Sequence, residues 1–203
     1  MFDCVATLAE VMGQRLRTQE IVDVLIPLLS RKWQALADTN KQLLPLFECF
    51  EQVVAAVGEE FITPYVQEIY ERCTRILKGV LDIVRSDARD GWALNEALFL
   101  RATELINVIL STLSAEKAAQ LIEHQDSMTL SLMVEFAADH SLLARQTIFG
   151  LLGDIQACIR DPSRVFLPEL IRNAKLNLQH DTSVMTAAGF TNGSSQVYGG
   201  SSQ

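Results

Sequence analysis

The side chains most able to do chemistry in this sequence are acidic and polar groups that recur at helical spacing. Asp3, Thr7 and Glu10 are separated by four and three residues, and Glu48 and Glu51 by three. In an α-helix, residues at such spacings share one face. A row of carboxylates on one face attracts a basic partner. An ordinary solvated helix face is the alternative for both sets, and the residues alone leave the two open.

The overall charge favours a protein partner over nucleic acid. The 203 residues carry a formal net charge of −8, whereas a nucleic-acid surface needs clustered Lys and Arg to displace counterions from phosphates. An acidic chain attracts basic segments if its carboxylates gather on one face. We therefore expect no direct contact with nucleic acid.

Signatures of catalysis and of metal binding are missing from the sequence. The three histidines, His124, His140 and His180, are scattered and have no Cys or carboxylate at metal-ligand spacing. None of the nucleophile-elbow, phosphate-loop or dinucleotide-binding patterns occurs. No set of titratable groups converges as an enzyme active site requires. We expect a binding protein without metal or cofactor rather than an enzyme.

The cysteines and the apolar segments indicate the compartment. Cys4, Cys49, Cys73 and Cys158 each fall in an apolar helical pattern, and none are at CxxC spacing. This predicts reduced core cysteines of an intracellular protein. The chain starts without basic residues ahead of its apolar part, so we expect no signal peptide. The apolar stretches are interrupted too early for insertion across a membrane.

The candidate residues are placed on helices by an apolar period that runs through almost the whole chain. No run of alternating β-branched residues predicts a strand. Short breaks with turn and capping residues should make consecutive helices antiparallel. The predicted helix pairs are 19–58, 61–113, 117–160 and a partial pair at 163–190, with 2–17 as an orphan second helix.

These pairs repeat with a period typical of HEAT arrays. Their second helices begin near residues 41, 93 and 141, a period of roughly 40 to 50 residues. Each pair is apolar on more than one face, and stacking of neighbours buries those faces. We predict an all-α fold, a right-handed HEAT-repeat α-solenoid of about three and a half hairpins over 1–180. A flexible Gly/Ser-rich tail follows at 189–203.

Several long segments resemble the transportin (karyopherin-β2) family of nuclear import receptors, within the importin-β group. They are "PLLSRKWQALADTNKQLLPLFECFEQVVAAVG", "ITPYVQEIYERCTRIL", "ARQTIFGLLGDIQAC" and "FLPELIRNAKLNL", in the same order as in the family. The resemblance covers roughly 2–180, and it is closest over 20–80 and 141–178. It implies a piece of the central to C-terminal HEAT arch, with first helices on the convex wall and second helices on the concave wall.

The resemblance also implies partners. The C-terminal arch of the family binds cargo proteins through basic, disordered nuclear localisation signals that end in Pro-Tyr. Ran GTPase and nucleoporins bind the full-length receptor, which shuttles between cytoplasm and nucleus. Asp3, Thr7 and Asp154 match positions where the family contacts cargo, and Phe190 takes the place of a pocket tryptophan. A carboxylate at such a position can pair with an arginine, and the hydroxyl can bond an extended backbone.

The remaining polar residues of the second helices leave alternatives open. Glu10, Glu48 and Glu51 are candidates for an acidic groove, and we expect the pair at 48 and 51 to be exposed. In 93–113 the family has an acidic residue near the start of the helix, but here the nearest candidates are Arg101 and Glu104. An inward-facing Arg101 would oppose a basic signal.

Two readings of function follow, and both are binding functions. The first is a nuclear import receptor segment that holds basic signals on an acidic concave surface. The alternative is a HEAT scaffold that organises a multi-subunit complex, as phosphatase scaffolds do. Asp154 illustrates the choice, since its carboxylate either meets a basic cargo or ties one repeat to the next.

Overall fold

The computed structural model of the protein describes residues 2–85 and 92–124, and the predictions for 125–203 lie outside this part, including those on Asp154, Cys158 and Phe190. Six α-helices and one 3-10 turn make up the described residues, which contain no strand, so the all-α prediction is confirmed. The elements are α1 (Phe2–Met12), η1 (Gly13–Leu16), α2 (Gln19–Ala35), α3 (Leu43–Val57), α4 (Glu59–Arg85), α5 (Trp92–Thr112) and α6 (Ala115–His124).

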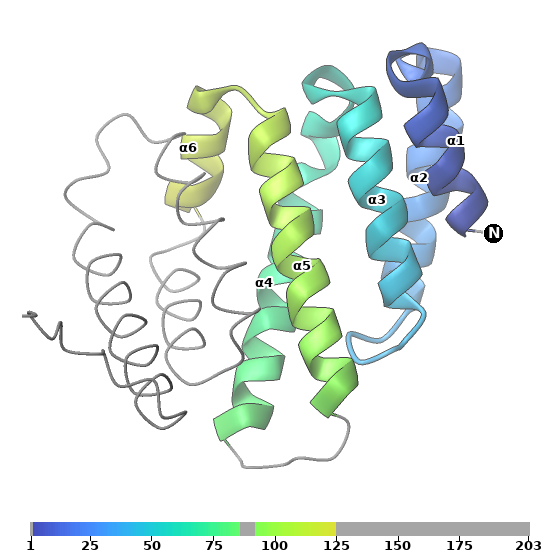
Figure 1. Ribbon diagram of the computed structural model, residues 1–203. Coiled ribbons are helices and arrows are strands. Elements are labelled where there is room, and N and C mark those ends of the chain that lie inside the picture. The colour runs from blue at the N-terminus through green and yellow to red at the C-terminus, as the bar shows by residue number, and fades with distance from the viewer. Residues whose placement is uncertain (1, 86–91, 125–203) are drawn as a thin grey trace, which may run out of the picture.

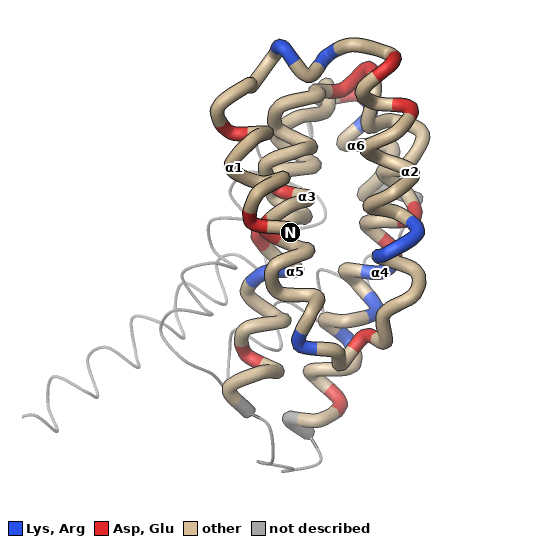
Figure 2. The backbone as a smooth tube through the Cα atoms, turned by 90° about the vertical axis from the view of Figure 1, so that its right-hand side faces the viewer, with Lys and Arg blue, Asp and Glu red and all other residues tan. Residues whose placement is uncertain are grey.

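The helices form two layers. Helices α1, α3 and α5 stand side by side and run in the same direction, and we call them the second-helix layer (Figure 1). Helices α2, α4 and α6 form the first-helix layer behind them, which is seen edge-on in Figure 2. Consecutive helices are antiparallel, as the short breaks predict. This is the stacked-hairpin architecture of a HEAT solenoid.

Glycines set two of the helix boundaries. Gly58 has φ 80 and ψ −180, a combination open essentially to glycine alone, and it ends α3 one residue before α4 begins. Gly13 has φ 48, and the chain there tightens into η1 instead of continuing α1. The predicted helix over 2–17 therefore ends at Met12, and the predicted helix from 61 begins two residues earlier, at Glu59.

A single apolar core fills the space between the layers. Its largest aromatic group is Trp33, whose ring meets the rings of Phe47 and Phe50 edge-on at centroid distances of 5.1 Å. Both phenylalanines are fully buried in α3. Edge-to-face pairs of this kind stabilise a core beyond their buried area. They lock α2 against α3 and so fix the orientation of the polar face of α3.

The cysteine prediction is correct for two residues and wrong for one. Cys49 and Cys73 are buried, but Cys4 is exposed. Helix α1 buries Ala6 and Ala9, and Cys4 lies on another stripe of the same helix, one turn before the exposed Leu8. An apolar period marks both stripes alike, because it cannot say which of them has a neighbouring helix to pack against.

An ionic cluster joins the chain just after α2 to the middle of α4 in the next hairpin. Asp38, in the α2–α3 connection, accepts hydrogen bonds from Arg72 Nε at 2.8 Å and from Arg75 Nε at 2.6 Å. Arg72 also donates to the Leu36 carbonyl and lies over the Trp33 ring at 4.7 Å. The Trp33 ring of α2 thus contacts a residue of the next hairpin. Burial alone would raise the pKa of Asp38, but the hydrogen bonds from the two arginines hold it below its usual value.

Candidate functional site: a groove between α3 and α5

A hollow of about 490 Å³ lies between two neighbouring helices of the second-helix layer, and we call it the α3–α5 groove. Apolar side chains form much of its wall, while its charged groups are two carboxylates and one guanidinium. The lining residues are Leu44, Pro45 and Glu48 from α3, and Ala97, Leu100, Arg101 and Glu104 from α5. An apolar cleft edged by charge suits the long stem and charged head of a lysine or arginine.

Helix periodicity places these residues on one seam. Leu44 and Glu48 are four residues apart on α3, and Arg101 and Glu104 are three apart on α5, so each pair lies one turn apart on its helix. The two helices are equivalent members of successive hairpins and run in parallel. Their polar stripes therefore meet along their length rather than at a single crossing.

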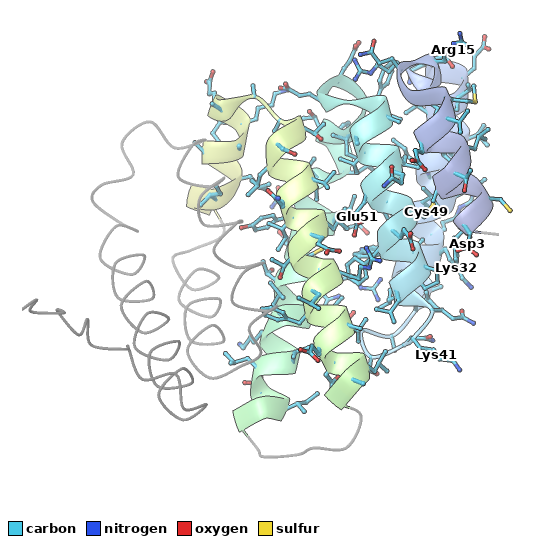
Figure 3. The ribbon with its side chains drawn as sticks, in the orientation of Figure 1. Asp3, Arg15, Lys32, Lys41, Cys49 and Glu51 are labelled. Carbon is cyan, nitrogen blue, oxygen red and sulfur yellow. The ribbon has the colours of Figure 1, made fainter. Side chains whose placement is uncertain are left out.

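Glu51 lies beside the groove, and its pKa is shifted from the usual value of a glutamate. Its side chain is only 10% exposed and lies on the side of α3 that faces α5 (Figure 3). Burial raises its pKa to about 7; Arg101 opposes this shift, while Glu104 and Glu48 add to it. One carboxylate oxygen, Oε1, is buried without a hydrogen-bond partner among the described residues. The expectation that this residue is exposed is wrong, because α3 is covered on the flank that carries it.

Arg101 faces the groove and is held there by two carboxylates. Its Nη1 lies 3.0 Å from Glu104 Oε2 and 3.5 Å from Glu51 Oε2. The Arg101 side chain is 37% exposed. The inward-facing arginine that the sequence raised as a possibility is therefore the one observed. It offsets one of the three nearby negative charges, counting Glu48.

The predicted polar stripe of α1 is exposed. Asp3, Thr7 and Glu10 are all exposed. The Thr7 hydroxyl donates to the Asp3 carbonyl at 2.9 Å, which leaves its oxygen free to accept from a peptide N–H. Asp3 lies near Cys49 in α3 (Figure 3), where burial first and this carboxylate second raise the pKa of the thiol to about 11.

The structure thus brings together only part of the predicted site. Glu48 and Glu51 join Arg101 and Glu104 in one cluster, while the α1 stripe lies on the next helix of the same layer. The pairing of Glu51 with Arg101 was missed from sequence. Their separation of 50 residues is close to one repeat of the array, so the two residues hold nearly equivalent places on successive second helices.

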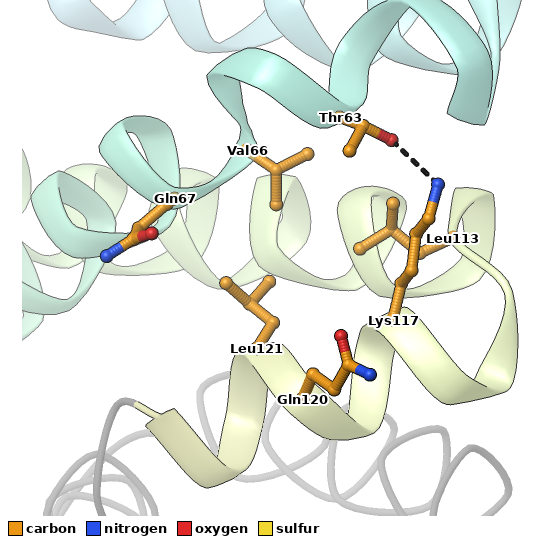
Figure 4. A pocket seen from close by; sticks show the side chains of 7 residues that line it. All are labelled: Thr63, Val66, Gln67, Leu113, Lys117, Gln120 and Leu121. Atoms are coloured by element: carbon orange, nitrogen blue, oxygen red, sulfur yellow. Dashed lines mark hydrogen bonds between the residues drawn. The ribbon is translucent and has the colours of Figure 1, made fainter.

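A second hollow, of about 370 Å³, lies between the first helices α4 and α6 (Figure 4). Lys117 crosses it, with Nζ 2.9 Å from Glu59 Oε1 and 3.3 Å from the Thr63 hydroxyl. Glu59 also accepts hydrogen bonds from the backbone and the hydroxyl of Ser114. These contacts join neighbouring hairpins, so this hollow serves as a joint and is a weaker candidate for a ligand.

Two further kinds of site are not found in the part that the structure describes. No three His, Cys, Asp or Glu side chains in 2–85 and 92–124 gather in a way that could hold a metal ion. None of the helices in those ranges has the length and apolar character needed to cross a membrane.

A comparison with known proteins finds that the chain is similar to transportins and to Importin subunit beta-2 of yeasts. The chain is 30% identical over 166 residues to human Transportin-1, a match that takes in 79% of this chain and 18% of that protein. It is 29% identical over 173 residues to Importin subunit beta-2 of Schizosaccharomyces pombe, covering 84% of this chain and 19% of that one. Rice Transportin-1 is 26% identical over 155 residues. The chain spans about a fifth of the length of these relatives, and no family model matches it.

Proposed function

Because the chain is transportin-like over about four fifths of its length, we propose that it acts as a segment of a nuclear import receptor. In this role it binds basic nuclear localisation signals of the Pro-Tyr type along its second-helix layer. The observation that carries the proposal is the α3–α5 groove, where Glu48, Glu51 and Glu104 surround one arginine. A ligand cation finds a net negative site there with an apolar floor.

Binding would combine burial of the apolar part of a ligand side chain with ion pairing of its charged end. The methylene stem of a lysine or arginine would lie against Leu44 and Leu100, and its charged head would reach Glu48 or Glu104 at the rim. Exposed ion pairs of this kind contribute up to about 1 kcal/mol each and weaken with salt. Several along an extended peptide give useful affinity only together.

The rest of an extended signal would follow the second-helix layer from the groove toward α1. Asp3 can pair with a second basic residue, and the Thr7 oxygen can accept from the peptide backbone. Asp154 and Phe190 are proposed as further contacts of the signal in the repeats that follow α6 in the chain, on the strength of the family resemblance. Glu10 would extend the acidic surface at the other end of α1.

The wider role follows from the same resemblance. We propose that the full-length receptor meets cargo, Ran GTPase and nucleoporins, and moves between cytoplasm and nucleus. The proposed activity is reversible binding, with no catalysis, no cofactor, no insertion into a membrane and no direct contact with nucleic acid.

The test is a titration of a fluorescein-labelled basic Pro-Tyr peptide into the full chain, followed by fluorescence anisotropy. Binding should weaken as salt rises, and E48Q should reduce it by about two- to fivefold. E20Q, which removes an exposed charge from the first-helix layer, is the matched control and should leave binding unchanged. D154N should weaken binding without changing the melting temperature, and a large loss of stability would show that this carboxylate is structural.

A folded chain that does not bind the peptide at low salt would refute the proposal. The scaffold function would then be favoured, since a scaffold holds folded subunits through the ridges of its repeats and has no need of an acidic groove.

A further inference from the structure

We propose that Arg101 is a built-in competitor of the α3–α5 groove, a guanidinium of the chain itself that occupies the carboxylates a basic ligand needs and must be displaced before the ligand binds. The inference rests on the proposed function and concerns its regulation. It makes Arg101 a residue that sets affinity, in addition to the acidic residues that supply the attraction.

The geometry of Arg101 is that of a bound ligand side chain. It stands in the hollow between the two helices, and its Nη1 contacts Glu104 at 3.0 Å and Glu51 at 3.5 Å. These are the contacts that an arginine from a peptide would make there. With 37% of its side chain exposed, Arg101 has solvent on one side into which it can swing without disturbing the core.

The hold of Arg101 on Glu51 is incomplete. A carboxylate offers about four acceptor sites, yet Glu51 Oε2 has a single contact at the outer limit of hydrogen bonding. Its Oε1 is buried without a partner in the described ranges. A buried, under-satisfied acceptor beside a displaceable cation favours exchange, because a ligand guanidinium seated more deeply can donate to both oxygens.

Electrostatics gives the direction of the effect. Arg101 cancels one of three negative charges and repels an incoming cation at the same spot. Removing its charge should therefore tighten binding of a basic peptide, whereas removing a residue that only supports the groove would weaken binding. A charge-preserving change to lysine should keep the competition.

The experiment measures the fluorescence anisotropy of the same fluorescein-labelled basic Pro-Tyr peptide with the full chain at low salt and pH 8.5, above the pKa of Glu51. We expect R101Q to bind about three- to tenfold more tightly than the parent chain and R101K to bind like the parent. R31Q, an exposed arginine of α2, is the control for net charge, and its effect should stay within about twofold. Circular dichroism confirms the helix content of each variant.

Because R101Q leaves Glu51 without its cation, a second comparison uses E51Q/R101Q against E51Q, where no buried charge is left unpaired. The gain should persist there through Glu48 and Glu104. If the parent chain binds and neither comparison shows a gain, the inference is refuted and the proposed function stands. If no variant binds, the proposed function fails and the inference with it. Binding by R101Q but not by the parent chain would support the competition by Arg101 and refute the proposed function for the parent chain.

Discussion

Replacing Glu51 by glutamine should raise the stability of the chain at alkaline pH and leave it nearly unchanged near pH 4. The pKa of this carboxyl is raised from 4.5 to about 7, chiefly by burial. Between those two values the folded state holds a proton that the unfolded state has released. Folding stability must therefore fall as pH rises through this window, and the full cost is present above pH 7.

The magnitude follows from the size of the shift. One pKa unit corresponds to about 1.4 kcal/mol, so a shift of this size corresponds to roughly 3 kcal/mol of stability lost between pH 4.5 and above pH 7. The side chain is nine-tenths buried, so solvent screens little of this cost. Glutamine keeps the shape and cannot ionise, which removes the cost.

The assay is urea unfolding followed by circular dichroism at a series of pH values from 4 to 8.5. The free energies of unfolding of E51Q and the parent chain should meet at the acidic end and separate by roughly 3 kcal/mol at the alkaline end. E10Q, at an exposed glutamate of α1, is the control and should run parallel to the parent. Parallel profiles for E51Q as well would refute the reasoning, since they would mean that Glu51 ionises as it does in the unfolded chain.

Three further experiments probe the fold. Gly58→Ala should cost about 2 kcal/mol in chemical denaturation because only glycine adopts its backbone angles without strain, whereas Gly79→Ala, in open space inside α4, should stabilise by up to about 1 kcal/mol; a loss at both positions would contradict the assignment. Arg72→Lys should cost roughly 2 kcal/mol and shift the tryptophan fluorescence, since lysine loses the forked hydrogen bonds and the ring contact; an unchanged melting curve would show the cluster to be incidental. In a Cys158→Ser background, Ellman's reagent should label one thiol of the folded chain, Cys4, and the two buried thiols only after unfolding; a second rapidly reacting thiol would contradict the described core.

The sequence was sufficient for the class of fold because its signals are local. Short breaks, such as the single residue Gly58 between α3 and α4, force consecutive helices to be antiparallel. The apolar period identifies the helices themselves. These features depend only on neighbours in the chain.

The site was harder to predict because the exposure of its residues depends on which sides of each helix are covered by neighbouring helices. A helix in a solenoid layer has neighbours on both sides, so the residues beside its exposed face are covered. Glu48 and Glu51 differ by less than one helical turn, yet the first is exposed and the second is buried against α5. Which of them is covered depends on the stagger of α3 and α5, and no local pattern encodes that stagger. Arg72 escaped notice for the same reason, since its partner Asp38 belongs to the preceding hairpin.

Neighbouring helices contact each other differently within the two layers, and this difference gives the array a preferred direction of bending. Helices α1, α3 and α5 pack backbone close to backbone, while few residues of α2 approach α4. The first-helix layer is connected largely through polar side chains, such as the hydrogen bond from Gln34 to Glu68 and the ion pair of Lys117 with Glu59. Water can replace a polar contact at little cost, whereas parting apolar surfaces is expensive. The second-helix layer is therefore the stiffer of the two. When the array bends, helices of the first-helix layer move apart or together, and they do so more readily at high salt, which weakens their ion pairs.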